Sequence, residues 1–251
     1  MTLTHIRAGA GLPFVMVHGY LAGAGIWRDQ IDHFRTSHDV IAVDLPGFGQ
    51  SVDVQAFDSI EVIARHVLSF LTDIGVENFI LMGHSMGGMV VQKMAALEPE
   101  RVSKLICYGT GPVGVMPGRF ETIDESRARI KSDGVPATAA RIAATWYLEG
   151  ENGPGFDLCK ALGEKVSEET ALACLTAWEG WDGRADLARI MTETLIICGD
   201  SDRSYNWSQT EALWRGIKSA SLAVIPGCSH NAHLEKPHLF NAALDDFVKR
   251  H

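Results

Sequence analysis

The chain has 251 residues, of which 46% are hydrophobic, so it can bury one large α/β core more readily than two small ones. Its formal net charge of -9 and pI near 5.5 argue against nucleic acid and anionic membrane as partners. No apolar run approaches the ~20 residues that span a bilayer, and the N-terminus lacks the pattern of a secretion signal, so we expect a cytoplasmic protein.

The cysteines give no sign of a structural metal or a disulfide framework. Their number is odd, and no pair has C-x-x-C spacing. Cys107 and Cys198 lie in apolar, strand-like runs, where core packing is the predicted role. We expect neither a metal nor a cofactor.

The first strong signal is an apolar run that leads into a glycine-rich loop. Residues 13–17 are typical of a fully buried strand, and the loop of residues 18–27 follows directly. The loop does not open as G-x-G-x-x-G, so a dinucleotide-binding fingerprint fits poorly. It fits better as an oxyanion loop, with the backbone amide of Tyr20 as a donor. The alternative is an ordinary turn in which His18 is simply hydrogen bonded.

A second buried strand, residues 40–43, precedes a turn rich in proline and glycine at residues 44–51. Asp44 opens this turn, and we predict that it holds the turn in place. It could be mistaken for a catalytic acid, but the acid should follow the nucleophile along the chain.

Residues 60–74 carry apolar side chains at helical spacing and predict a helix that covers the sheet. Asp58 and Glu61 resemble a capping box at its start, and Gly75 fits a glycine cap at its end.

The stretch from residue 79 to residue 97 passes from a buried strand, through a glycine-bracketed serine, into a helix. The pattern Gly83-x-Ser85-x-Gly87 is that of a nucleophile elbow, a turn so tight that only small neighbours fit. The turn would place Ser85 at a helix N-terminus, where free amides can bind a developing negative charge. In this architecture the amide of Met86 and an amide of an earlier loop, here Tyr20, form the oxyanion hole.

The strand pattern stops after a short strand at residues 104–109. Residues 112–185 instead contain helical segments near residues 124–131, 136–148 and 167–178, separated by joints rich in proline and glycine. We predict that residues 112–185 form a helical cap inserted into a core made of residues 1–111 and 186–251. The tryptophans of this block, including Trp146 and Trp178, could equally form the cap's own core.

The core pattern resumes with strands at residues 194–199 and 221–225 and ends with a helix at residues 237–249. Strands that alternate with helices predict an α/β fold with a mostly parallel sheet and helices on both faces.

A serine nucleophile needs a general base, and the base needs an acid that orients it. The expected chain order is serine, acid, histidine. Ser85, an aspartate at 200 or 202, and His230 satisfy this order, each in a loop directly after a predicted strand. The carboxyl edge of the sheet would therefore bring the three together.

Other histidines compete for the role of base. His84 precedes the nucleophile in the elbow and should point away from its hydroxyl, and His18 belongs to the earlier loop. His233 lies three residues beyond the strand-proximal His230 and is predicted to support the loop.

Several motifs, weak singly and specific together, resemble the α/β-hydrolase superfamily and extend over essentially the whole chain. They are His18-Gly19, Asp44-x-Pro46-Gly47-x-Gly49-x-Ser51, Gly83-His84-Ser85-Met86-Gly87-Gly88, Gly199-x-x-Asp202 and His230-x-x-x-x-Glu235-x-Pro237. In that family the aspartate of G-x-x-D is the acid and the last histidine is the base. The resemblance therefore favours Asp202 over Asp200 and supports His230.

Within the superfamily, residues 83–89 and 186–190 look most like 3-oxoadipate enol-lactonases. The glycine-rich loop also resembles that of hydrolases that cleave carbon–carbon bonds in aromatic ring-fission products. The chain departs from the pattern at Met191 to Thr194 and at Ser204 to Trp207, where usual prolines are absent. The second departure touches the pocket rim, and our candidates for substrate contact are Trp146, Tyr205 and Trp207.

The resemblance implies a Ser-His-Asp hydrolase that cleaves a small carboxylic ester or an enol-lactone-like substrate without a cofactor. Carbon–carbon bond hydrolysis is the leading enzymatic alternative, and cofactor-free oxygenation occurs in a few relatives. An alternative of another class is a small-molecule receptor or signalling protein with an intact triad. The arginines of the predicted cap could hold a substrate carboxylate or could simply be solvated; they are Arg119, Arg127, Arg129, Arg141 and Arg184. Whether the chain forms a homo-oligomer stays open.

Overall fold

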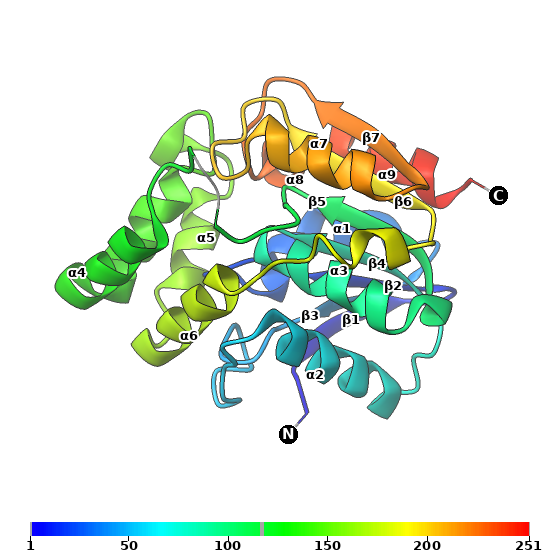
Figure 1. Cartoon of the computed structure of the whole chain (residues 1–251), viewed down its shortest axis with the longest axis horizontal. Coiled ribbons are helices and arrows are strands. Elements are labelled where there is room, and N and C mark those ends of the chain that lie inside the picture. Colours follow the sequence, from blue (N-terminus) through cyan, green and yellow to red (C-terminus); the bar gives the residue numbers. More distant parts are fainter. Residues whose placement is uncertain (1, 116–117, 251) are drawn as a thin grey trace.

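A seven-stranded sheet forms the centre of the computed structural model, which describes residues 2–115 and 118–250 (Figure 1). The strand order is β1-β3-β2-β4-β5-β6-β7, and every neighbouring pair is parallel except β1 with β3. The strands are β1 His5–Gly9, β2 Pro13–Val17, β3 Asp39–Val43, β4 Phe79–His84, β5 Val102–Tyr108, β6 Thr194–Gly199 and β7 Ala220–Ile225.

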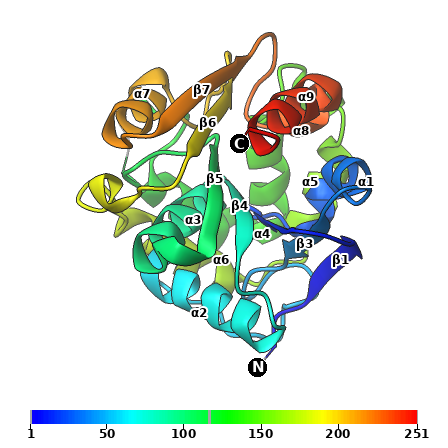
Figure 2. The same ribbon diagram turned by 90° about the vertical axis from the view of Figure 1, so that its right-hand side faces the viewer.

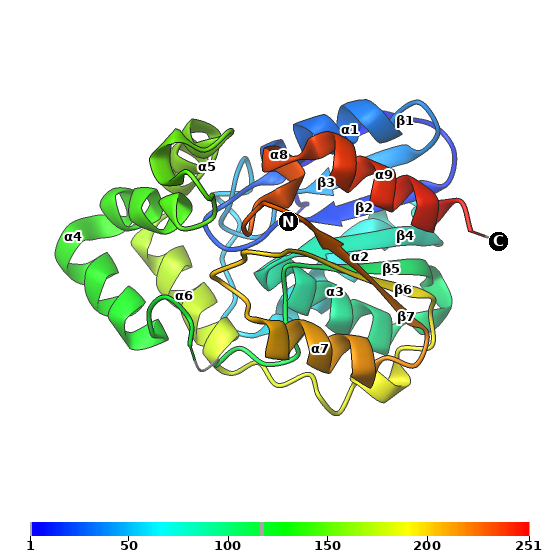
Figure 3. The ribbon, with the colours of Figure 1, turned by 90° about the horizontal axis from the view of Figure 1, so that it is seen from above.

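Helices cover both faces of the sheet, which confirms the predicted α/β architecture (Figures 2 and 3). One face carries α1 Arg28–Phe34, α8 Ala232–Glu235 and α9 Pro237–Val248, and the other carries α2 Ile60–Asp73, α3 Met86–Leu97 and α7 Trp207–Gly216. The central strands are buried on both sides, as their continuous apolar runs require. Among the described residues, no helix is both long and apolar enough to cross a membrane.

Three further helices gather at one end of the sheet, at the left of Figure 1. They are α4 Ile123–Ala144, α5 Phe156–Gly163 and α6 Glu168–Glu179, and they leave and rejoin the sheet between β5 and β6. Two of the predicted cap helices are halves of α4, which bends at Gly134 (φ 81°, ψ 165°) just before Pro136. Helix α5 was not predicted, because it is short and glycines flank it.

Two local predictions were incomplete or wrong. The sequence showed only a polar start where β1 pairs at the sheet edge, because its half-exposed side chains give no apolar run. The capping box proposed at Asp58 and Glu61 does not form: Ser59 is the N-cap of α2 without a side-chain bond, and Glu61 pairs with Arg65 instead. A true capping box joins Thr122 and Glu125 at the start of α4.

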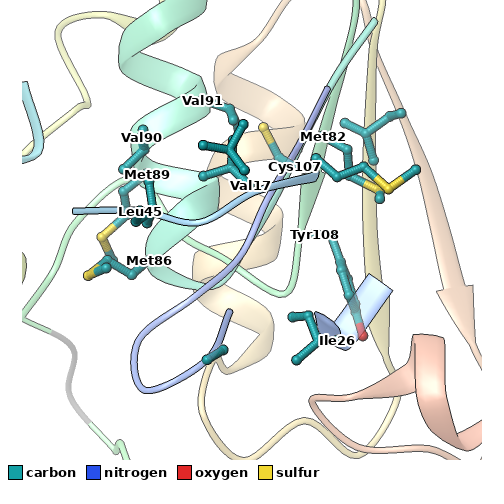
Figure 4. Close-up of a cluster of buried hydrophobic side chains, with 14 of the residues drawn as sticks. Val17, Ile26, Leu45, Met82, Met86, Met89, Val90, Val91, Cys107 and Tyr108 are labelled. Atoms are coloured by element: carbon teal, nitrogen blue, oxygen red, sulfur yellow. The ribbon is translucent and has the colours of Figure 1, made fainter. Parts of the chain in front are cut away.

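Buried apolar side chains fill the space where α3 lies against the sheet (Figure 4). Val17 of β2, Met82 of β4 and Cys107 of β5 are fully buried there, beside Val91 of α3. These contacts fix the position of α3 relative to β4. It thereby fixes the turn between them, which contains Ser85.

We predict that Gly87→Ala strongly destabilises the fold. A Cβ atom at Gly87 would lie 2.4 Å from the carbonyl oxygen of His18 and 2.5 Å from that of Val17, so α3 and the end of β2 would have to separate. We expect a loss of about 2 kcal/mol or more in the free energy of unfolding, measured by urea denaturation. Gly25→Ala is the matched control, because no atom lies within 4 Å of its Cβ position. Equal stability of the two variants would contradict the prediction.

Candidate active site

Ser85 occupies a strained turn between β4 and α3. Its φ of 57° and ψ of -121° lie in a region that side chains rarely adopt, and among the described residues Leu21 is the other non-glycine residue with positive φ. A Cβ atom at Gly83 would lie 2.2 Å from the carbonyl oxygen of Gly87, so the turn requires glycine there. The hydroxyl of Thr110 donates to the carbonyl oxygen of Ser85 over 2.7 Å and helps to hold the turn.

His230 and Asp202 meet at the same edge of the sheet, after β7 and β6. The Nδ1 atom of His230 lies 2.9 Å from Oδ2 of Asp202, and both side chains are almost completely buried. The other oxygen, Oδ1, accepts hydrogen bonds from the backbone amides of Ser204 (2.7 Å) and Tyr205 (3.1 Å). Both carboxylate oxygens therefore have donors, and the orientation of the imidazole is set by a fixed acceptor.

The backbone of His230 is also held in place. The hydroxyl of Tyr108 donates to the His230 carbonyl oxygen over 2.7 Å, and Nε2 of His84 lies 3.2 Å from the same oxygen. The ring of His84 packs 4.3 Å from the ring of His230. His84 thus supports the candidate base through contacts with its ring and its backbone, and His84 is not itself the base.

The competing acid and base candidates have other partners. Asp200 accepts hydrogen bonds from the amides of Gly227 (2.9 Å) and Cys228 (3.3 Å), which ties β6 to the loop after β7. The Nδ1 atom of His233 lies 2.9 Å from the hydroxyl of Tyr108, whose oxygen also bonds to the loop after β7. Asp202 and His230 are the pair that the structure brings together.

The loop after β2 passes directly beside the nucleophile. A Cβ atom at Gly19 would lie 2.8 Å from Cβ of Ser85. His18 fixes this loop, because its Nδ1 donates to the Gly19 carbonyl oxygen (2.7 Å) while its Nε2 accepts from the Leu45 amide (3.0 Å). Asp44 also holds the loop, since its Oδ1 accepts from the amide of Ala24 over 2.7 Å.

The two backbone amides predicted as oxyanion donors belong to Met86 and Tyr20. The amide of Met86 is the first of α3 and has no intrahelical acceptor. The amide of Tyr20 has no hydrogen-bond partner among the described residues. Met86 directly follows Ser85, and Gly19, which precedes Tyr20, passes beside Ser85, so the oxyanion role of both amides stays a prediction.

The three aromatic candidates lie in different places. The ring of Tyr205 stacks on His230 with centroids 5.7 Å apart and an angle of 18°, and the ring of Trp146 lies 6.2 Å from His230. Trp207 is 51% exposed and lines a cavity of about 150 Å³ together with Asp202 and Tyr205. The structure brings Tyr205 and Trp146 to the imidazole and leaves Trp207 at the surface.

Sequence reasoning missed two neighbours of the site. Thr110 lies beyond the end of β5 and carries no motif, although it holds the elbow. Trp178 of α6 reaches the site from the cap: its ring lies 6.0 Å from Tyr20 and 6.3 Å from Tyr205. Its position within a helix gave no signal that distinguished it from a residue of the cap's own core.

A parallel sheet with a serine elbow, a glycine loop after an earlier strand and helices inserted before a later strand defines the class of α/β hydrolases. A family model described as alpha/beta hydrolase fold matches residues 13–237. The chain belongs to this family, as its motifs predicted.

The chain is similar along nearly its whole length to α/β hydrolases whose names give different activities. A putative carbamate hydrolase RutD from Pseudomonas savastanoi is 27% identical and covers 95% of each chain. The 2-hydroxy-6-oxo-6-phenylhexa-2,4-dienoate hydrolase of Comamonas testosteroni is 28% identical over 97% of this chain and 90% of its own. The solved enol-lactonase of Burkholderia xenovorans LB400 superposes with a TM-score of 0.89 at 19% identity, over 99% and 96% of the chains, which shows the shared fold.

We predict that buried histidines make the protein lose stability in acid. Burial lowers the pKa of His233 to about 3, and it also lowers the pKa values of His18 and His84. The unfolded chain takes up these protons near pH 6.5, so the stability is fully present above that pH and is lost as the pH falls toward 3. Each such histidine contributes a slope of about 1.4 kcal/mol per pH unit.

Urea denaturation at pH 7 and pH 5 measures this effect. We expect the unfolding free energy of His233→Gln to depend less steeply on pH than that of the wild type. The difference in slope should correspond to the uptake of about one proton. Identical slopes for the two proteins would contradict the assignment of His233 as a neutral buried group.

Proposed function

We propose that the protein is a serine hydrolase that cleaves a small carboxylic ester or lactone through an acyl-enzyme. The observation that carries this proposal is the 2.9 Å hydrogen bond between buried His230 and Asp202, at the sheet edge that also presents the strained Ser85. Membership of the α/β-hydrolase family supports hydrolytic chemistry. The resemblance to 3-oxoadipate enol-lactonases favours an ester or lactone bond.

The hydrogen bonding of His230 specifies its proposed role. A carboxylate can only accept, so the proton of the neutral imidazole resides on Nδ1 and Nε2 keeps its lone pair. In the proposed reaction, Nε2 takes the proton of the Ser85 hydroxyl while its oxygen attacks the substrate carbonyl. Asp202 then stabilises the imidazolium.

The remaining steps use groups already in place. The tetrahedral oxyanion would receive hydrogen bonds from the amides of Tyr20 and Met86, and the imidazolium would return its proton to the leaving oxygen. Water activated by His230 would release the acyl group and restore Ser85. No cofactor enters this sequence of steps.

Carbon–carbon bond hydrolysis is a second candidate, and the similarity to the Comamonas testosteroni enzyme favours it. The same three side chains would serve a ketone whose adjacent carbon–carbon bond breaks. A receptor would bind a small molecule but turn it over very slowly. Mass spectrometry of lactones, short esters and ring-fission products incubated with the wild-type protein separates the three.

We predict that Ser85→Ala lowers kcat for 4-nitrophenyl acetate by at least ~10³-fold, because the hydroxyl is the attacking group. The release of nitrophenol measures the rate. Ser132→Ala, which changes an exposed serine of the cap, should leave the rate at the wild-type level. Retained hydrolysis by pure Ser85→Ala protein would overturn the proposed mechanism.

We also predict different outcomes for the two neighbouring aspartates. Asp202→Asn should lower kcat by about 10³ to 10⁴-fold, because an amide facing Nδ1 favours the wrong tautomer of His230. Asp200→Asn should keep most of the activity, because the described partners of the Asp200 carboxylate are the Ser201 hydroxyl and the amides of Gly227 and Cys228. A larger loss of kcat in Asp200→Asn than in Asp202→Asn would reverse the assignment of the acid.

A further inference from the structure

The backbone on both sides of His230 is hydrogen bonded to groups outside the sheet. The amide of Ser229, the residue before it, donates to Oε2 of Glu235 over 2.6 Å. The amide of Asn231, the residue after it, donates to the carbonyl oxygen of Trp146 over 3.0 Å. Trp146 lies just beyond the end of α4, so one of the two flanking amides bonds directly to the inserted helices.

Glu235 connects the other flanking amide to the same segment. While its Oε2 accepts from Ser229, its Oε1 accepts from the backbone amide of Leu148 over 2.8 Å. Hydrogen bonds from backbone amides to a carboxylate are stronger than those to a neutral acceptor. A single carboxylate therefore bridges the loop after β7 and the segment after α4.

The side chain of Asn231 adds a third connection. Its Nδ2 donates to the hydroxyl of Tyr147 (3.0 Å) and to Sγ of Cys159 in α5 (3.4 Å). The Tyr147 hydroxyl and the Cys159 sulfur lie 3.1 Å apart, and all three side chains are buried. Residues 146–148, which we call the α4 joint, thus each bond to the loop after β7 or to its bridging carboxylate.

The α4 joint holds the part of His230 that the sheet does not. From the sheet side, Asp202 fixes the imidazole and Tyr108 fixes the carbonyl oxygen. The two flanking peptide groups decide where the Cα–Cβ bond of His230 points, and both are held from the α4 joint. A displacement of about 1 Å in a catalytic group can lower a rate by about 10²-fold, so these peptide groups matter for the proposed chemistry.

The bridge has one protected end and one exposed end. Ser229 is fully buried, whereas Leu148 is 40% exposed. A cavity of about 360 Å³ borders the exposed end, and Leu148, Glu149 and Glu235 are among the residues that line it. Water competes for exposed hydrogen bonds, so the bond from Leu148 can open while the bond from Ser229 persists.

We propose that Glu235 is a positioning residue, which makes the alignment of His230 toward Ser85 depend on the docked position of the α4 joint. This inference rests on the proposed function of Ser85 and His230. When the α4 joint moves away, the backbone on both sides of His230 loses its fixed partners, and the imidazole turns more freely on Asp202. The inserted helices thereby control the base as well as the space beside it.

Glu235→Gln tests the bridge with almost no change of shape. Glutamine has one acceptor oxygen, so its side chain cannot accept from Ser229 and Leu148 with separate oxygens. We expect kcat for 4-nitrophenyl acetate, measured well below the Tm, to fall by about 10 to 10²-fold. Glu149→Gln is the matched control and should keep the wild-type rate, because Glu149 lines the same cavity but lies outside the bridge.

Proton NMR reports the alignment of His230 without any turnover. The Nδ1 proton shared with Asp202 should give a downfield signal in the wild type, identified by its absence in His230→Gln. We expect Glu235→Gln to broaden this signal and to speed its exchange with water. Glu149→Gln should leave the signal as in the wild type.

Tyr147→Phe provides a second variant, whose change is confined to the inserted helices. It removes one acceptor of the Asn231 side chain and leaves Sγ of Cys159 as the other. We expect the same changes in kcat and in the signal of the Nδ1 proton, but smaller ones. This variant carries the test if Glu235→Gln does not fold.

An unchanged His230 signal and a wild-type kcat in folded Glu235→Gln, even with a lower Tm, would show a purely structural carboxylate and overturn the positioning role. If only Tyr147→Phe folds, an unchanged signal in that variant would do the same. Retained turnover in Ser85→Ala would instead overturn the proposed function, while the His230 signal would still test the bridge.

Discussion

The close approach of α3 to the ends of β2 and β4 is the constraint on which the rest of the structure depends. Ser85 can hold positive φ only because the elements on both sides of it are fixed, and such a conformation costs about 1–3 kcal/mol. The buried contacts of α3 with the sheet offset that cost many times over. Glycine at 83 and 87 makes the approach sterically possible, and Thr110 ties the turn to the neighbouring strand.

The candidate base, His230, packs against side chains that stay uncharged. Burial lowers the pKa values of His84 and His233, and the hydroxyl of Tyr108 bonds to the loop that carries His230. A positive charge on His230 would therefore have one strong partner, the carboxylate of Asp202. This arrangement concentrates the electrostatic stabilisation on a single ring, and it positions that ring with neutral groups that do not compete for its proton.

Chain order and strand ends made much of the site predictable. Parallel strands end at one edge, so loops after β4, β6 and β7 had to converge, and the order of Ser85, Asp202 and His230 followed a known architecture. Chain order and strand ends could not predict individual contacts between distant segments. The sequence could not show that Asp200 accepts a hydrogen bond from the loop amide of Gly227, or that Arg129 and Arg141 share the carboxylate of Glu121. Partners of that kind are chosen by tertiary packing, which periodicity does not encode.

The polar groups around the candidate active site differ in how fully they are hydrogen bonded. Asp202 accepts three hydrogen bonds, and the ring of His18 uses both nitrogens, whereas Nδ1 of His84 and Nε2 of His233 are buried without a partner among the described residues. Nε1 of Trp178, on the side of the inserted helices, is likewise buried without an acceptor in the part of the chain that the structure describes. Whole-length similarity to a putative carbamate hydrolase and to a dienoate hydrolase, at nearly equal identity, agrees with one fold that serves different substrates.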